Sequence, residues 1–282
     1  QAIFYDIFSI VHAVLNGSKK LLVLGSSGSL IFPLIKFFFP KVQIITNIDG
    51  LEWYRSKWNK GLKKLFIKYI IKIAIKYSDK IVSDNQAIAD YLLLSFNQDS
   101  IVIPYGGDHA LIQQTQNNDK NYFLGLCRIE PENNISIILQ AFAENSQNLI
   151  FIGNWDYSDY GKDMRESFKN YKNIKLMDPE YDPEVLFNIR ANCTSYIHGH
   201  SAGGTNPSLV EMMHFGKDII AFDCEFNRAT LENEGYYFHD VNSLKSLTNK
   251  SNHNLHGKKI LEIAKRRYTW DIVNKQYFDL FR

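Results

Sequence analysis

The sequence predicts an α/β protein of two doubly wound parallel sheets that face each other across a cleft. Short apolar runs of strand length alternate with amphipathic stretches of helix length along the 282 residues. The alternation has the same rhythm in two halves, and a polar run at 113–120, rich in Gln and Asn, separates them. Because alternating strands and helices form parallel sheets, we expect domains at 1–112 and 121–256, joined by this linker. Residues 257–282 are expected to form one long helix that packs back towards the first domain.

The composition is that of an ordinary globular protein, with 45% hydrophobic and 22% charged residues. A formal net charge of +2 and the lack of a basic tail give no argument for a nucleic-acid partner. The three cysteines, Cys127, Cys193 and Cys224, are far apart and lie in apolar or strand-like stretches, which indicates reduced thiols and a cytoplasmic protein. No apolar run in the sequence reaches the roughly 18 residues of a membrane-spanning helix.

In the first half, strands and helices are expected in alternation. In chain order these are a helix from Ala2 to Leu15, a strand from Lys20 to Leu24, a helical stretch broken near Pro33, a strand from Val42 to Thr46, a helix from Lys57 to Tyr77, a strand from Lys80 to Ser83, a helix from Asn85 to Phe96 and a strand from Ser100 to Pro104. The loop after residues 42–46 carries Asp49, Glu52, Trp53 and Arg55. Ligands bind at the carboxyl ends of strands in such sheets, so these side chains are candidates for a sugar site. The alternative is a core role for Trp53 and an ion pair between Arg55 and Glu52.

The helix expected from Lys57 to Tyr77 carries a lysine at every fourth position. These lysines are Lys60, Lys64, Lys68, Lys72 and Lys76. They form a basic ridge, while Leu65, Phe66 and Tyr69 fall on the apolar side of the same helix. Such a ridge suits an anionic membrane surface. A merely solvated face of a packed helix is an equal alternative.

The second half repeats the alternation. Its expected strands are at 122–127, 149–153, 174–177, 193–197 and 218–222, and its expected helices are at 135–144, 162–171, 183–192 and from Pro207 onward, with a further strand-end loop at 223–228. Arg128 directly follows the first of these strands and so lies at the ligand-binding edge of the sheet. An arginine there can hold a diphosphate through paired hydrogen bonds. The alternative is a surface ion pair with Glu130 or Glu132.

The stretch from Tyr196 to Gly216 combines a strand end, a glycine loop and a helix start. Gly203 and Gly204 allow the backbone to approach a ligand, and Asn206 followed by Pro207 forms a cap and a first helical residue. Free N–H groups at the helix start favour a phosphate, and Glu211, one turn later, is an acceptor for sugar or ribose hydroxyls. Together these features predict a nucleotide-sugar site. The alternative is a tight connection without a ligand.

Two histidines, His198 and His200, flank Gly199 in the same loop. A metal site would need a third ligand at suitable spacing, and the sequence offers none nearby. Hydrogen bonding to phosphate or sugar is therefore the favoured role for the pair, and no metal is expected.

Four separate motifs resemble those of the retaining glycosyltransferases of family four. They are Val102-Ile-Pro-Tyr-Gly-Gly-Asp108 before the linker, Cys127-Arg-Ile-Glu-Pro-Glu-Asn133 at the diphosphate loop, Asn206-Pro-Ser-Leu-Val-Glu-Met-Met213 at the donor helix, and the tryptophan segment Tyr268-Thr-Trp-Asp-Ile-Val-Asn-Lys-Gln-Tyr277. The resemblance covers nearly the whole chain. It implies the GT-B fold of two Rossmann-like domains, the first of them incomplete here because roughly a hundred residues of βα units would precede it.

The resemblance also implies roles for the candidate residues. A sugar would leave a nucleoside diphosphate with retention at the anomeric carbon and without a metal. Arg128, Asn133 and the segment Gly203, Gly204, Thr205, Asn206, Pro207, Ser208 and Leu209 would hold the donor, with His198 helping to neutralise the leaving diphosphate. Glu211 would bind the ribose. Asp49 would contact the sugar or the incoming hydroxyl, and Glu52, Trp53 and Arg55 would shape the acceptor side.

Three departures from the family pattern point to a subgroup. Gly203 stands where the family has the first glutamate of a spaced pair, Asn133 replaces a diphosphate-binding lysine, and Asp49 replaces a histidine. With these substitutions the chain resembles bacterial polysaccharide rhamnosyltransferases that use dTDP-rhamnose, acting on a glycan or lipid-linked acceptor. A UDP-linked donor is the alternative within the family.

Two other functions remain compatible with the sequence. The missing first glutamate and the incomplete first domain would suit a nucleotide-sugar-binding protein without turnover. A sugar-nucleotide epimerase of the same two-domain architecture would need no acceptor. Product analysis with and without an acceptor separates these alternatives.

Overall fold

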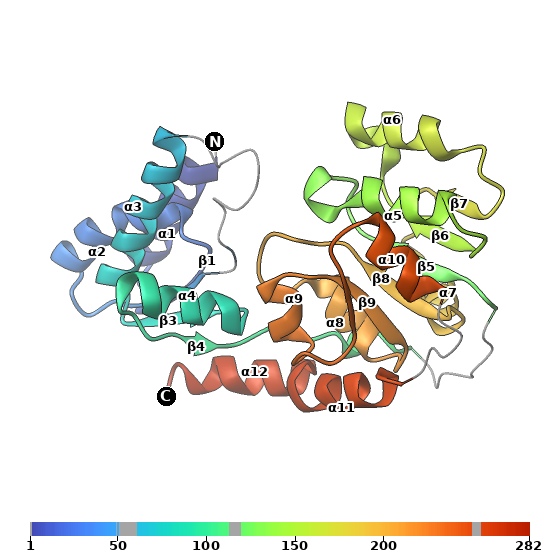
Figure 1. Ribbon diagram of the computed structural model, residues 1–282. Coiled ribbons are helices and arrows are strands. Elements are labelled where there is room, and N and C mark those ends of the chain that lie inside the picture. Colours follow the sequence, from blue (N-terminus) through green and yellow to red (C-terminus); the bar gives the residue numbers. More distant parts are fainter. Residues whose placement is uncertain (1, 49, 51–60, 113–119, 250–254) are drawn as a thin grey trace. The chain divides into compact units, whose positions relative to one another are not determined.

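A computed structural model describes residues 2–48, 50, 61–112, 120–249 and 255–282. The chain divides into two compact units (Figure 1), and each unit contains one parallel sheet with helices packed on it. Unit 1 comprises Gln1–Pro104, Ala202–Gly204 and Asn274–Arg282, and unit 2 comprises Tyr105–Ser201 and Thr205–Val273. Within the described residues, no helix is long and apolar enough to cross a membrane.

Unit 1 has a four-stranded parallel sheet in chain order. Its strands are β1 (Lys20–Leu24), β2 (Gln43–Ile48), β3 (Lys80–Ser83) and β4 (Ile101–Val102), and its helices are α1 (Ala2–Leu15), α2 (Phe32–Phe38), α3 (Leu62–Tyr77) and α4 (Gln86–Phe96). The core of this unit forms where α1, α2 and α3 pack on the sheet through Ile10, Val14, Phe32, Ile35 and Ala74. Consecutive parallel pairing of this kind is what alternating strands and helices produce.

The buried face of α3 differs from the expectation. Ile70, Ile71 and Ala74 are buried, whereas Leu65, Phe66 and Tyr69 are exposed. The helix packs against α2 and the 3₁₀ turn Ser27–Ile31, and these two neighbours cover a narrow side of it. A large apolar surface on α3 therefore remains open among the described residues.

Unit 2 has a six-stranded parallel sheet in the order β10-β9-β8-β5-β6-β7. Its strands are β5 (Phe123–Leu126), β6 (Leu149–Ile152), β7 (Ile174–Met177), β8 (Ser195–His198), β9 (Asp218–Phe222) and β10 (Tyr236–Phe238). Its helices are α5 (Ile135–Ala143), α6 (Asp159–Phe168), α7 (Pro183–Ala191), α8 (Pro207–Met213), α9 (Glu225–Thr230), α10 (Val241–Thr248), α11 (Gly257–Arg267) and α12 (Trp270–Asp279). Helix α12 begins in unit 2 and ends in unit 1. One apolar cluster includes residues of α7, α8 and α11, and a second includes residues of α5, α6 and α10. Alternate residues of β8 and β9 enter one cluster or the other, as expected for a sheet covered on both faces.

The expectation of one helix over 257–282 is wrong, because the chain forms α11 and α12 with a break at Tyr268. The Tyr268 side chain is buried and its hydroxyl donates to the Thr230 carbonyl at 2.9 Å. Its own carbonyl accepts from the Gly107 N–H at 2.7 Å and from His214 Nε2 at 2.9 Å. The Tyr268 N–H still donates to the Ala264 carbonyl at 2.8 Å, but its carbonyl bonds to these tertiary donors instead of continuing the helix. The segment 223–228, expected as a loop, likewise contains the start of α9.

Candidate functional site

The order of the sheet in unit 2 reverses between β5 and β8, which lie side by side. The chain leaves β5 towards β6 on one side, whereas it leaves β8 towards β9 on the other. Connections therefore diverge at this point, and ligands of open α/β sheets bind there, outside the carboxyl ends of the strands. The loop after β5 carries Arg128, and the loop after β8 carries the glycine motif.

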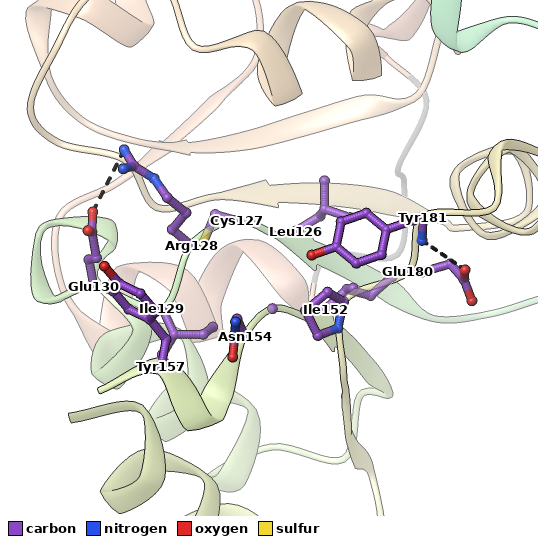
Figure 2. A pocket seen from close by; sticks show the side chains of 12 residues that line it. Leu126, Cys127, Arg128, Ile129, Glu130, Ile152, Asn154, Tyr157, Glu180 and Tyr181 are labelled. Carbon is purple, nitrogen blue, oxygen red and sulfur yellow. Dashed lines mark hydrogen bonds and ion pairs between the residues drawn. The ribbon is translucent and has the colours of Figure 1, made fainter. Parts of the chain in front are cut away.

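A pocket of about 370 Å³ opens beside Arg128 at this edge (Figure 2). Its lining comes from the ends of β5 and β6 and from the loop after β7: Leu126, Cys127, Arg128, Ile129, Glu130, Ile152, Gly153, Asn154, Tyr157, Pro179, Glu180 and Tyr181. Figure 2 shows Arg128 and Glu130 at one end and Tyr181 with Glu180 at the other. The volume lies in the range of small-molecule sites.

The pocket combines apolar side chains with two tyrosines, one arginine and the carboxylates of Glu130 and Glu180. Leu126, Ile129 and Ile152 supply the apolar part of the lining. Tyr157 and Tyr181 are 78% and 83% exposed, so their rings are accessible to a planar ligand. Burial raises the pKa of the Cys127 thiol to about 12, so this group remains a neutral thiol and is no nucleophile at pH 7.

Among the residues that the structure describes, Arg128 has one ion-pair partner, and the contact is long. Its guanidinium nitrogen lies 3.8 Å from a Glu130 carboxylate oxygen, and the Arg128 side chain is 67% exposed. The ion pair with Glu130, which was the alternative reading of this residue, is thus present in a weak form. Exposed pairs of this geometry contribute about 0 to 1 kcal/mol, so an anionic ligand can displace Glu130 at little cost.

Asn133 connects the loop after β5 to the loop after β8. Its amide nitrogen donates to the Arg128 carbonyl at 2.7 Å, and its amide oxygen lies 2.7 Å from His200 Nδ1. Asn134 donates to the Gly199 carbonyl at 2.8 Å. A Cβ on Gly199 would collide with the Asn133 carbonyl oxygen, so the close approach of the two loops requires glycine at 199. In the structure the Asn133 amide therefore holds the Arg128 loop through contacts with the protein itself.

His198 is buried, with 1% of its surface exposed, at the end of β8. Its Nδ1 lies 3.5 Å from the Tyr196 hydroxyl, and its Nε2 has no hydrogen-bond partner in the described part of the chain. Burial, together with nearby His200, lowers the pKa of His198 well below 6.5, so the ring is neutral at pH 7. A neutral His198 supplies no positive charge to a diphosphate at pH 7, which leaves hydrogen bonding as the role available to it.

The start of α8 is closed by its own cap. The Asn206 side-chain oxygen accepts from the Ser208 N–H at 3.0 Å and from the Ser208 hydroxyl at 2.8 Å. Pro207 has no N–H, so two of the groups expected to receive a phosphate are not available. Leu209 and Thr205 are buried. The N–H groups expected to bind an anion are therefore fewer than the motif implies.

Both glycines of the motif have a geometric reason. Gly203 has a φ of 133°, a conformation that other residues rarely adopt. Gly204 lies in unit 1, where a Cβ would collide with the carboxylate of Asp84. Glycine is therefore required at 203 by the backbone conformation and at 204 by the close approach of the Asp84 side chain.

Glu211 pairs with two cationic or hydrogen-bonding side chains. One carboxylate oxygen contacts Arg190, and the other lies 3.3 Å from His109 Nε2. The Arg190 and Glu211 side chains are 8% and 16% exposed, so the pair is largely buried. A carboxylate has about four acceptor positions, so Glu211 keeps capacity for hydroxyl donors of a ligand.

Four other predicted site residues lie outside the described residues: Asp49, Glu52, Trp53 and Arg55. For the histidine pair, the described ranges contain no group of three His, Cys, Asp or Glu residues arranged to hold a metal ion.

Sequence reasoning missed Arg190, His109, Tyr157 and Tyr181. Arg190 lies in the last turn of a helix without any motif, and no spacing connects it to Glu211. His109 directly follows the Gly-Gly-Asp motif, and this adjacency was the one signal available in the sequence.

Comparison with known families divides the chain at residue 109. Residues 109–268 match the family described as Glycosyl transferases group 1, and residues 1–108 match a domain of unknown function (DUF1972). No curated protein sequence matches the chain.

Solved structures of similar fold cover almost the whole chain. Sucrose-phosphate synthase from Thermosynechococcus elongatus has a TM-score of 0.78 at 14% identity, covering 99% of this chain and 76% of that one. HepE from Anabaena in complex with UDP has a TM-score of 0.76 at 14% identity, covering 98% and 81%. A glycosyltransferase from Rickettsia africae has a TM-score of 0.74 at 12% identity, covering 99% and 80%.

We predict that Arg190→Met lowers the free energy of unfolding by about 3 kcal/mol, because it leaves the Glu211 carboxylate without its buried partner. The double variant Arg190→Met/Glu211→Leu should lose less than the single variant, since no unpaired charge remains. Arg266→Met, which breaks an exposed pair with Glu232, is the matched control and should cost less than about 1 kcal/mol. Urea denaturation measures all three. An unchanged midpoint for Arg190→Met would contradict the pairing.

Proposed function

Because the chain belongs to the Glycosyl transferases group 1 family, whose model matches 109–268, we propose that it transfers a sugar from a nucleoside diphosphate to an acceptor. Its fold is GT-B, with two Rossmann-like α/β sheets. The single observation that carries the proposal is the pocket beside Arg128, which opens at the carboxyl ends of β5, β6 and β7, on the β5 side of the switch point. Retention at the anomeric carbon and the absence of a metal cofactor are part of the proposal.

We assign the donor nucleotide to unit 2. The accessible tyrosine rings and the apolar lining of the pocket suit the planar base, and the exposed guanidinium of Arg128 suits the diphosphate. Positive charge at that position stabilises the leaving diphosphate as negative charge develops on it. Glu211 accepts from the pentose hydroxyls of the nucleoside, of which dTDP has the 3′-hydroxyl alone, while neutral His198 forms a hydrogen bond to the ligand through Nε2. Thr205, Asn206, Pro207, Ser208 and Leu209 lead into α8 and form its start in the same unit, and Gly203 and Gly204, directly before them in the sequence, remain part of the proposed donor segment.

We propose dTDP-rhamnose as the donor, with a UDP-linked sugar as the alternative. The rhamnose assignment rests on the resemblance of the Asp49 and His198 motifs to rhamnosyltransferases. UDP is supported by HepE, whose structure contains UDP. The acceptor in this proposal is a glycan or a lipid-linked glycan of a cell-surface polysaccharide. Asp49 contacts the sugar or the incoming hydroxyl, and Glu52, Trp53 and Arg55 form the acceptor side.

A cytoplasmic membrane surface is the proposed location of the acceptor. Lys72 and Lys76 of α3 are exposed on the helix that also exposes Leu65, Phe66 and Tyr69. Lysines beside exposed apolar and aromatic side chains are typical of faces that bind anionic lipid. The lysine ridge in this proposal comprises Lys60, Lys64, Lys68, Lys72 and Lys76, of which Lys60 and the Lys64 side chain lie outside the described residues.

Nucleotide binding tests the donor assignment. We expect dTDP and UDP to bind with micromolar or tighter affinity in calorimetry, and Arg128→Ala to weaken binding by about tenfold or more through loss of charge-assisted hydrogen bonds. Arg266→Ala removes an exposed arginine elsewhere in unit 2 and should leave affinity unchanged. Folded protein that binds neither nucleotide would contradict the assignment. Tighter binding of UDP than of dTDP would contradict dTDP-rhamnose as the donor but would still agree with a glycosyltransferase of this family.

Product analysis tests the reaction itself. With donor and acceptor present we expect a glycosidic product with retained anomeric configuration, and EDTA should not change the rate. Donor binding without any product would favour a binding protein, and conversion of the donor sugar without an acceptor would favour an epimerase.

Vesicle binding tests the membrane surface. The triple variant Lys68→Gln/Lys72→Gln/Lys76→Gln should reduce partitioning onto phosphatidylglycerol vesicles at low salt by about tenfold or more, because each lysine near an anionic surface contributes about 1 kcal/mol. A triple variant of exposed lysines in unit 2, Lys162→Gln/Lys169→Gln/Lys172→Gln, makes the same charge change and should have no effect. Equal partitioning of both triple variants would remove the membrane surface from the account.

A further inference from the structure

The Glu211 carboxylate is oriented by a short chain of side chains that ends at Trp270. The Trp270 indole nitrogen donates to His109 Nδ1 at 3.1 Å. His109 Nε2 in turn lies 3.3 Å from a Glu211 oxygen. All three residues belong to unit 2.

The indole determines which nitrogen of His109 carries the proton. Indole N–H is a donor with no acceptor capacity, so Nδ1 must accept and the neutral ring must carry its proton on Nε2. That proton points to Glu211, and the ring therefore donates to the carboxylate. In the opposite tautomer, the Nδ1–H would meet the Trp270 N–H, so that two donors faced each other. The bare Nε2 would then meet a Glu211 carboxylate oxygen, so that two acceptors faced each other.

The neighbouring backbone holds this arrangement in place. The Trp270 N–H donates to an Asp108 carboxylate oxygen at 2.8 Å. A Cβ on Gly106 would stand 2.7 Å from the Trp270 ring, and one on Gly107 would stand 2.6 Å from the backbone of Val210, the residue before Glu211. The two glycines thus allow the segment before His109 to lie between Trp270 and α8. This packing explains both the Gly-Gly-Asp-His sequence and the tryptophan after Tyr268.

Arg190 and His109 have different tasks at Glu211. Arg190 is buried and offsets the charge of one carboxylate oxygen. His109 is half exposed and donates to the other oxygen from the open side. Because both oxygens are held, the carboxylate is fixed in one orientation about its terminal bond, and its remaining acceptor positions point in fixed directions.

We propose that His109 is a positioning residue for nucleotide binding, which fixes the Glu211 carboxylate towards the ribose hydroxyls while Trp270 selects the required tautomer. This inference rests on the proposed function, because it takes Glu211 as the ribose acceptor. Loss of His109 should weaken recognition of the ribose hydroxyls and leave base and diphosphate contacts intact.

The test compares two nucleotides that differ in the ribose hydroxyls alone. Affinity is measured by calorimetry for UDP and for 2′,3′-dideoxyuridine 5′-diphosphate, and their ratio reports hydroxyl recognition. We expect wild-type protein to prefer UDP by about tenfold or more, and Glu211→Gln to lose most of this preference. His109→Phe should reduce the preference about fivefold without changing affinity for the dideoxy nucleotide, and Trp270→Phe should act in the same direction more weakly.

Two further variants separate positioning from folding. His109→Gln keeps a donor that can reach Glu211 and should retain more of the preference than His109→Phe. His239→Phe changes an exposed histidine that contacts Asp240 rather than Glu211 or Trp270, and it is the matched control. Thermal unfolding establishes that each variant is folded, and if His109→Phe does not fold, Trp270→Phe and His109→Gln carry the comparison.

Each outcome decides a different part of the account. Unchanged preference in folded His109→Phe overturns the positioning role, and so does equal weakening of both nucleotides, which would indicate a merely structural residue. Loss of preference in Glu211→Gln with none in the His109 and Trp270 variants leaves the ribose role of Glu211 standing and removes this inference. If the wild-type protein shows no preference for UDP over the dideoxy nucleotide, both the ribose role of Glu211 and the positioning role of His109 are wrong.

Discussion

The adjacency of β5 and β8 is the constraint on which the candidate site depends, because it joins strands that are separate in the chain. Their following loops leave in opposite directions, which brings Arg128 to the same edge as the glycine motif. Asn133 and Gly199 then hold the two loops at a separation that no larger residue at 199 would permit. The backbone at Arg128 is therefore held at the carboxyl edge of β5, and a fixed position of the charged residue favours electrostatic stabilisation of a leaving group.

In the candidate site, the protonation and pairing of each ionisable side chain depend on how deeply it is buried. The buried groups are neutral or paired: the Cys127 thiol keeps its proton because burial raises its pKa, His198 is neutral because burial lowers its pKa, and Glu211 pairs with Arg190. Arg128, by contrast, is exposed and weakly paired. An unpaired buried charge costs several kcal/mol, so this division lets the site offer a positive charge at the rim without destabilising the core.

Alternation of strands and helices predicted the α/β class, because it is a local signal that tertiary contacts do not reverse, and the GT-B fold was implied by the family resemblance. The predicted positions of Arg128 just after a strand and of Glu211 about one turn into a helix agree with the ends of β5 and the start of α8. The sequence could not reveal the Arg190 and His109 partners of Glu211, since contacts between residues distant in the chain leave no local pattern. The helix break at Tyr268 was missed for the same reason, because three tertiary hydrogen bonds impose it. Asn133 was assigned to the donor by family analogy, while its amide bonds are made within the protein.

A structure of the protein crystallised with dTDP or UDP tests the central claim most directly. The account predicts density for the base in the pocket between Tyr157 and Tyr181, the diphosphate within hydrogen-bond distance of Arg128, and a ribose hydroxyl on Glu211. A nucleotide bound away from the carboxyl edge of β5, with Arg128 still beside Glu130, would contradict it.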